Sequence, residues 1–170
     1  VHAVASIAAV GGNFRFLGGG AFWSNRIVYH WNKTVVEGLD VLDPITRILD
    51  MSRIGPVLTF EDEAVRKGPP VTAMLVQNTN PAAVAPDTNR VLKGLKRDDL
   101  FLCVHEQFLT ETAQLADIVL PATMFLEHDD IYQAGGHMHL QIHRAVIEAP
   151  EQARSNHWVI NELAKRLGAQ

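Results

Sequence analysis

Three short apolar runs with helical segments between them constrain the fold of this chain more than any other feature. Residues 71–76, 100–104 and 118–120 are continuous apolar runs of strand length, which is typical of strands covered on both faces. Residues 86–97 place apolar side chains on one helical face, and residues 110–116 form a second, shorter helical segment. Alternating strands and helices with short connections favour a parallel sheet with right-handed crossovers. The sequence therefore predicts an α/β lobe with a mostly parallel sheet.

Capping residues predict where the helices of this lobe begin and end. Pro86 is expected at the first position of the first helix, and Thr110 is expected to cap the second. Ser155 is expected to cap a last amphipathic helix that ends at Gly168. The apolar residues that this helix is expected to place on one face are Ile160, Leu163, Ala164 and Leu167.

The first 70 residues lack this regular pattern. An apolar helix is predicted over residues 1–10, followed by a long irregular segment with a short helix near residues 51–59. We expect residues 1–70 to pack on the lobe formed by residues 71–170, so that the chain makes a single structural domain. Because three strands make a thin sheet, we expect partner strands outside this chain and an incomplete lobe.

Charge and cysteine content exclude several functional classes. The net charge of -4 argues against wide non-specific binding to nucleic acid or to anionic membranes, and no apolar run approaches the roughly 20 residues that span a bilayer. Cys103 is the single cysteine, which excludes iron–sulfur or zinc sites built on several thiolates of this chain. The abrupt apolar start without Met suggests a piece of a longer protein, so localisation stays unknown.

Polar residues follow each predicted strand at its carboxyl end, where open parallel sheets bind ligands. Amide side chains and backbone N–H groups after the first strand suit phosphates and heterocycle edges. A carboxylate after the second strand suits a ribose diol or the N–H edge of guanine, and threonine hydroxyls would lie near a phosphate. The candidate cofactor-binding residues are Gln77, Asn78, Thr79, Asn80, Pro81, His105, Glu106, Thr110 and Thr112.

The same residues also allow a purely structural interpretation. Asn and Pro are common turn residues, and Thr110 could act only as a helix cap. No Gly-x-Gly-x-x-Gly motif follows any of the three strands, which argues against an ordinary nicotinamide or flavin site. From the pattern alone, cofactor binding and simple turn formation both remain open.

Two other functional classes are compatible with the sequence. His137 and His139, with His143 at the same parity, have the spacing of metal ligands on one side of a strand, so a metal-dependent hydrolase is one alternative. The other is a non-catalytic binding or assembly module. Such a module would have a fully covered sheet, whereas a fragment would expose a sheet edge or an apolar face, which a homodimer could close.

Several runs of the sequence match the motifs of one family closely. These runs are Gly18-Gly19-Gly20, Asn78-Thr79-Asn80-Pro81, HEQFLTETA at 105–113, ADIVLPA at 116–122, EHDDIY at 127–132, and Gly136-His137. In these runs the chain closely resembles the molybdopterin oxidoreductase family, which includes enzymes of the dimethyl sulfoxide reductase and formate dehydrogenase type.

The resemblance implies a three-layer, Rossmann-like lobe that forms one half of a discontinuous domain. That domain would hold a molybdopterin guanine dinucleotide carrying molybdenum or tungsten, with the loop at 78–81 and His105-Glu106 at the nucleotide part and Thr110 and Thr112 close by. The metal ligand and any iron–sulfur cluster would lie outside this chain, so no catalysis is expected from it alone. The implied partners are the remaining domains of the parent enzyme and iron–sulfur or other electron-transfer subunits.

Overall fold

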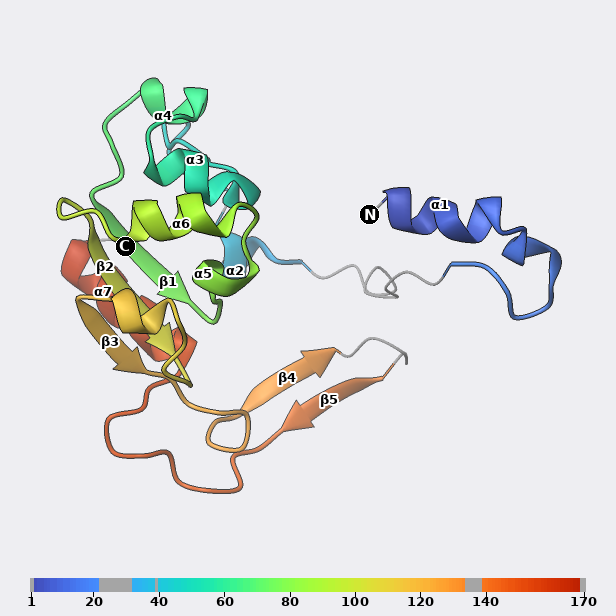
Figure 1. Cartoon of the computed structure of the whole chain (residues 1–170). Coiled ribbons are helices and arrows are strands. Elements are labelled where there is room, and N and C mark those ends of the chain that lie inside the picture. The colour runs from blue at the N-terminus through green and yellow to red at the C-terminus, as the bar shows by residue number, and fades with distance from the viewer. Residues whose placement is uncertain (1, 22–31, 39, 134–138, 169–170) are drawn as a thin grey trace. The chain divides into compact units, whose positions relative to one another are not determined.

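The computed structural model describes residues 2–21, 32–38, 40–133 and 139–168 (Figure 1). The chain divides into two compact units. The smaller comprises residues 1–39 and 131–142, and the larger comprises residues 40–130 and 143–170. The predicted single domain, with a boundary at residue 70, stays a prediction.

The smaller unit contains a short apolar helix, α1 (His2–Val10), as the sequence predicts. The chain leaves this helix through Gly12, whose φ of 67° is in the left-handed region that glycine adopts without strain. A single 3-10 turn (Asn13–Arg15) and a one-turn helix, α2 (Thr34–Glu37), follow. Strands β4 (Asp130–Gln133) and β5 (Leu140–His143) form a two-stranded antiparallel sheet.

A three-stranded parallel sheet forms the centre of the larger unit and confirms the predicted strands. It consists of β1 (Ala73–Gln77), β2 (Phe101–Glu106) and β3 (Ile118–Pro121), in the order β1-β2-β3. The register pairs Gln77 with His105 and Glu106 with Pro121. The carboxyl ends of all three strands therefore meet at one edge of the sheet.

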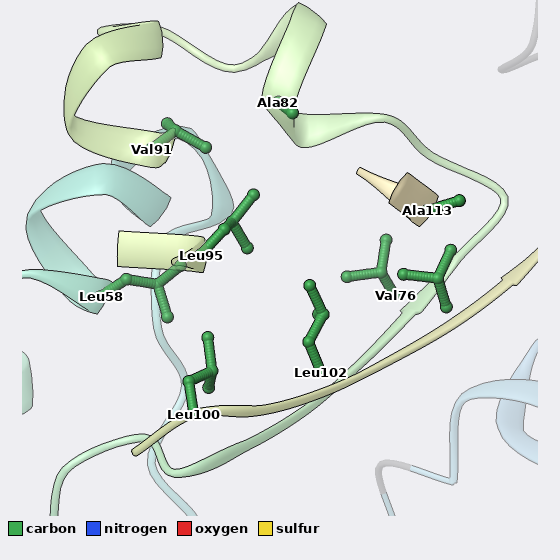
Figure 2. Close-up of a cluster of buried hydrophobic side chains, with 9 residues drawn as sticks. Leu58, Val76, Ala82, Val91, Leu95, Leu100, Leu102 and Ala113 are labelled. Atoms are coloured by element: carbon green, nitrogen blue, oxygen red, sulfur yellow. The ribbon is translucent and has the colours of Figure 1, made fainter. Parts of the chain in front are cut away.

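Helices α3 (Ile54–Leu58), α5 (Pro81–Val84) and α6 (Thr88–Leu95) cover one face of this sheet. Their apolar residues form the core with those of the strands, as Figure 2 shows. The buried cluster consists of Leu58, Val76, Ala82, Val91, Leu95, Leu100, Leu102, Val104 and Ala113. Each fully buried Leu or Val side chain contributes about 1.5–3 kcal/mol relative to an exposed one.

The opposite face of the sheet is only partly covered, by helix α7 (Asn156–Leu167). Ser155 caps this helix by accepting a hydrogen bond from the Trp158 amide, and Gly168 ends it in the left-handed conformation, as predicted. The predicted apolar face is only partly turned inward, because Val159 is the buried residue of α7. Of the predicted residues, Leu163 lines the groove against the sheet and Ala164 is half-buried, whereas Ile160 and Leu167 are exposed.

Two predicted helix starts differ from the structure. Helix α6 begins at Thr88, two residues after Pro86, because Asp87 is the N-cap and accepts from the Arg90 amide. Asp87 has a φ of 59°, which a short polar residue tolerates. The helix predicted over residues 110–116 is a single 3-10 turn (Ala113–Leu115). The remaining short elements are a 3-10 turn (Met51–Arg53) and α4 (Glu63–Arg66).

Candidate functional site

Asn80 and Thr112 clamp the loop after β1 to the loop after β2. The Thr112 hydroxyl and its backbone N–H both donate to Asn80 Oδ1, at 2.7 and 3.2 Å. The same hydroxyl oxygen accepts a hydrogen bond from the Ala82 amide at 3.0 Å. Thr112 is 0% exposed, so these bonds form away from water, where an unpaired polar group would be costly.

The amide nitrogen of Asn80 completes this clamp. Asn80 Nδ2 donates to Glu111 Oε2 at 2.6 Å. This hydrogen bond is the main cause of the lowered pKa of the Glu111 carboxyl, and a backbone N–H adds to it. Both polar atoms of the Asn80 side chain are therefore engaged within the protein, and the side chain holds two loops together.

A second set of contacts joins the ends of β1 and β2 on the α7 side of the sheet. Gln77 Nε2 lies 3.0 Å from His105 Nδ1, and His105 Nε2 lies 3.1 Å from the carbonyl oxygen of Arg154. His105 is 0% exposed. This imidazole is therefore an internal link between strand ends.

Three of the candidate residues lie open at the strand ends: Asn78, Thr79 and Glu106. Asn78 has a φ of 53°, and its amide donates to the His105 carbonyl at 3.2 Å. The side chains of Asn78 and Thr79 are exposed and make no hydrogen bond within the described part of the chain. Glu106 is half-buried, and its Oε1 accepts from the Gln107 amide at 2.7 Å.

The last two candidate residues act in local structure. Pro81 is buried and occupies the first position of α5, where its missing N–H has no consequence. The Thr110 hydroxyl accepts from the Ala113 amide at 3.2 Å, but Thr110 does not cap the predicted helix, because the element there is a 3-10 turn whose N-cap is Thr112. Cofactor contacts of all nine candidate residues stay a prediction.

The structure adds a polar chain that the sequence analysis missed. Gln107 donates through Nε2 to the carbonyl oxygen of Thr123 at 3.0 Å. The Thr123 hydroxyl lies 2.8 Å from His128 Nδ1, and His128 Nε2 lies 3.9 Å from Asp130. The only available signal was the position of Gln107 immediately after Glu106 at a strand end. These polar contacts connect the ends of β2 and β3.

A groove of about 580 Å³ lies between α7 and the partly covered face of the sheet. Its walls include Leu75, Phe101 and Leu120 from the strands and Leu163 from α7. Burial raises the pKa of the Cys103 thiol in this wall. None of the nine candidate residues lines the groove, so we interpret it as uncovered core surface and not as the polar site.

The alternative metal site has no counterpart in the described ranges. No group of three His, Cys, Asp or Glu side chains there could hold a metal ion. His137 lies outside the described residues, His139 is exposed, and His143 ends β5. Across these same ranges, no helix has the length and apolar character needed to cross a membrane.

Comparison with known proteins identifies the family of this chain. The family model described as molybdopterin oxidoreductase matches residues 17–166. The probable oxidoreductase YoaE of Bacillus subtilis (strain 168) is 39% identical over 169 residues, which cover 99% of this chain and 24% of that protein. Trimethylamine-N-oxide reductase 1 of Escherichia coli (strain K12) is 31% identical, over 79% of this chain and 16% of that protein.

A solved structure extends the likeness to the fold. Acetylene hydratase from Pelobacter acetylenicus matches with a TM-score of 0.59 and 27% identity, over 71% of this chain and 16% of that one. The chain thus spans at most about a quarter of the length of these proteins. From the extent of the family match and the motifs that it contains, this chain belongs to the molybdopterin oxidoreductase family.

Proposed function

We propose that this chain is the segment of a molybdenum or tungsten oxidoreductase that positions the guanosine and phosphate part of a molybdopterin guanine dinucleotide. The observation that carries the proposal is the pair of hydrogen-bonded links at the carboxyl ends of β1 and β2. The Asn80–Thr112 clamp and the Gln77–His105 contact fix the backbone on either side of the exposed residues Asn78 and Thr79. Such fixed strand ends are where parallel sheets bind nucleotides.

The chemistry of the open residues fits a nucleotide. The amide and hydroxyl of Asn78 and Thr79 can donate hydrogen bonds to phosphate oxygens. Glu106 lies at the end of the neighbouring strand, and one of its carboxylate oxygens is tied to Gln107. The carboxylate can accept from two adjacent donors, such as a ribose diol or the N–H edge of guanine. The donors and the acceptor thus lie at neighbouring strand ends.

When bound, the cofactor would supply oxygen-atom or electron-pair transfer at its metal. This chain would only hold the cofactor in position, through hydrogen bonds to its nucleotide part. The metal ligand, any iron–sulfur cluster and the substrate pocket belong, in this proposal, to the remaining domains of the parent enzyme and to electron-transfer subunits. Catalysis is accordingly not expected from the chain alone.

Replacing Glu106 by Gln in the full-length parent tests this proposal. The change keeps the size of the side chain but removes the charge and one acceptor, so we expect a lower content of bound cofactor. The content is measured as guanosine monophosphate released from the purified enzyme by acid hydrolysis. Loss of one charge-assisted hydrogen bond corresponds to about a tenfold weaker affinity.

Asp98→Asn is the matched control for this experiment. Asp98 is an exposed carboxylate just before β2, at the opposite end of the strands, and its loss should leave the cofactor content unchanged. A parent enzyme without pterin would refute the proposal. Equal cofactor content in Glu106→Gln, Asp98→Asn and wild type would refute the role of Glu106.

A further inference from the structure

The buried ring of His105 has a defined proton on one nitrogen. Its Nε2 faces the carbonyl oxygen of Arg154 at 3.1 Å, and a carbonyl can only accept a hydrogen bond. Nε2 must therefore carry a hydrogen and donate it. The ring is 0% exposed, and neither hydrogen-bond partner carries a charge at the contacting atom. Gln77 presents its amide nitrogen to the other ring nitrogen, so the two contacts give Nε2 the donor role and Nδ1 the acceptor role.

The proton on Nε2 determines how the neighbouring amide is turned. In a neutral imidazole with hydrogen on Nε2, Nδ1 has a lone pair and can only accept. The group of Gln77 that faces Nδ1 at 3.0 Å must then be the donor Nε2, which is the arrangement observed. The Gln77 carbonyl oxygen, Oε1, therefore points away from His105. It accepts no hydrogen bond within the described part of the chain.

We propose that His105 is a positioning residue that makes Gln77 Oε1 a hydrogen-bond acceptor for an N–H or O–H group of the cofactor's guanosine. This inference rests on the proposed function, which places the guanosine at the carboxyl ends of β1 and β2. Gln77 lies there, as the last residue of β1 and directly before Asn78 and Thr79. The carbonyl of Arg154 fixes the ring, the ring fixes the amide, and the amide presents an acceptor. If the side-chain amide of Gln77 were flipped, its NH2 group would face the N–H or O–H donors of the guanosine, and no hydrogen bond could form.

The test measures how fast the full-length parent loses its cofactor. At intervals the protein is separated from free cofactor, and the guanosine monophosphate released from the protein by acid hydrolysis is quantified. Gln77→Met keeps the length of the side chain without polar atoms, so loss should be about tenfold faster than in wild type. Gln77→Glu restores an outward acceptor oxygen, with His105 protonated opposite the carboxylate, and should retain the cofactor within about threefold of wild type.

A double-mutant cycle separates positioning from mere structural support. In His105→Asn the small amide can pair with Gln77 in either orientation, so it no longer fixes the direction of Oε1. This variant should lose cofactor several-fold faster when Gln77 is present, and it should have no further effect in the Gln77→Met background. Additive effects of the two changes would show that His105 acts only through stability, which would overturn the inference.

The state of the ring gives an independent spectroscopic readout. Nitrogen-15 spectra of the histidine side chains, assigned by comparison with His105→Asn, should show hydrogen on Nε2 alone in wild type and on both nitrogens in Gln77→Glu. Hydrogen on Nδ1 in the wild-type enzyme would overturn the proposal that His105 orients the Gln77 amide. A wild-type enzyme without pterin would refute the proposed function itself, whereas normal retention of cofactor in Gln77→Met would refute only this inference.

Discussion

The hydroxyl of Thr112 joins two chain segments, residues 80–82 and its own loop, although it is a single polar group. It donates to Asn80 Oδ1 and accepts from the Ala82 amide, and it is completely buried. Removal of the hydroxyl would leave the buried Ala82 amide and the half-buried Asn80 Oδ1 with fewer partners. Unsatisfied groups of this kind cost more than the net value of the hydrogen bonds themselves. The position of the loop at 78–81 therefore depends on this side chain.

We expect Thr112→Val to lower the free energy of unfolding by about 1–3 kcal/mol. Valine fills nearly the same volume, so the effect isolates the two hydrogen bonds of the hydroxyl from packing. Urea unfolding followed by circular dichroism measures the change. Thr112→Ser is the control, because it keeps the hydroxyl and loses one methyl group. A valine variant as stable as the serine variant would contradict the clamp.

At the scale of elements, close contact between α3 and α6 anchors the irregular segment to the lobe. Gly94 makes this contact possible, since a Cβ at this position would lie 2.4 Å from the Cβ of Leu58. Leu58 is 1% exposed and belongs to the central hydrophobic cluster. Alanine is ordinarily the better helix former by about 1 kcal/mol. Here the steric conflict with a buried side chain outweighs that preference.

Gly94→Ala is therefore expected to destabilise the protein by about 1–3 kcal/mol, whereas helix propensity alone would predict that it stabilises the protein. Thermal unfolding by calorimetry provides the measurement. Lys93→Ala on the exposed side of the same helix serves as the control and should stay within about 0.5 kcal/mol of wild type. An increase in stability for Gly94→Ala would show that the two helices can move apart without cost.

At the scale of the whole molecule, the larger unit leaves part of its sheet without a covering layer. Phe101 is 49% exposed on this surface and Ile118 is 45% exposed, and the groove beside α7 opens onto it. β1 is an edge strand of the sheet. Exposed apolar surface next to an open strand edge favours association with another protein segment. This is the surface that the sequence analysis expects on a fragment.

We expect the chain in isolation to self-associate through this uncovered surface. Phe101→Glu places a charge in its centre and should shift the sedimentation coefficient toward that of the monomer. Phe108→Glu changes an aromatic residue of similar exposure in the loop after β2, away from the groove, and should leave the association unchanged. A monomeric wild-type chain, or an equal effect of both substitutions, would exclude this surface as the site of association.

Local properties of the sequence determined the strands, the two ends of the last helix and the family. A continuous apolar run of strand length needs two covering layers, so residues 71–76, 100–104 and 118–120 could be assigned from their composition. Ser155 and Gly168 were also predictable, because capping depends on backbone groups within one helical turn. The family motif around Asn80 was likewise visible, and it located the strand ends correctly.

Only the tertiary structure decided which of the polar residues face inward. His105 and Thr112 are completely buried, whereas Asn78 is exposed, although the sequence offered no basis for distinguishing the three candidates. The reason is that their partners, such as the Arg154 carbonyl, come from distant parts of the chain. The buried side of α7 was decided in the same way, since the helical period defines an apolar stripe but not the surface that it meets.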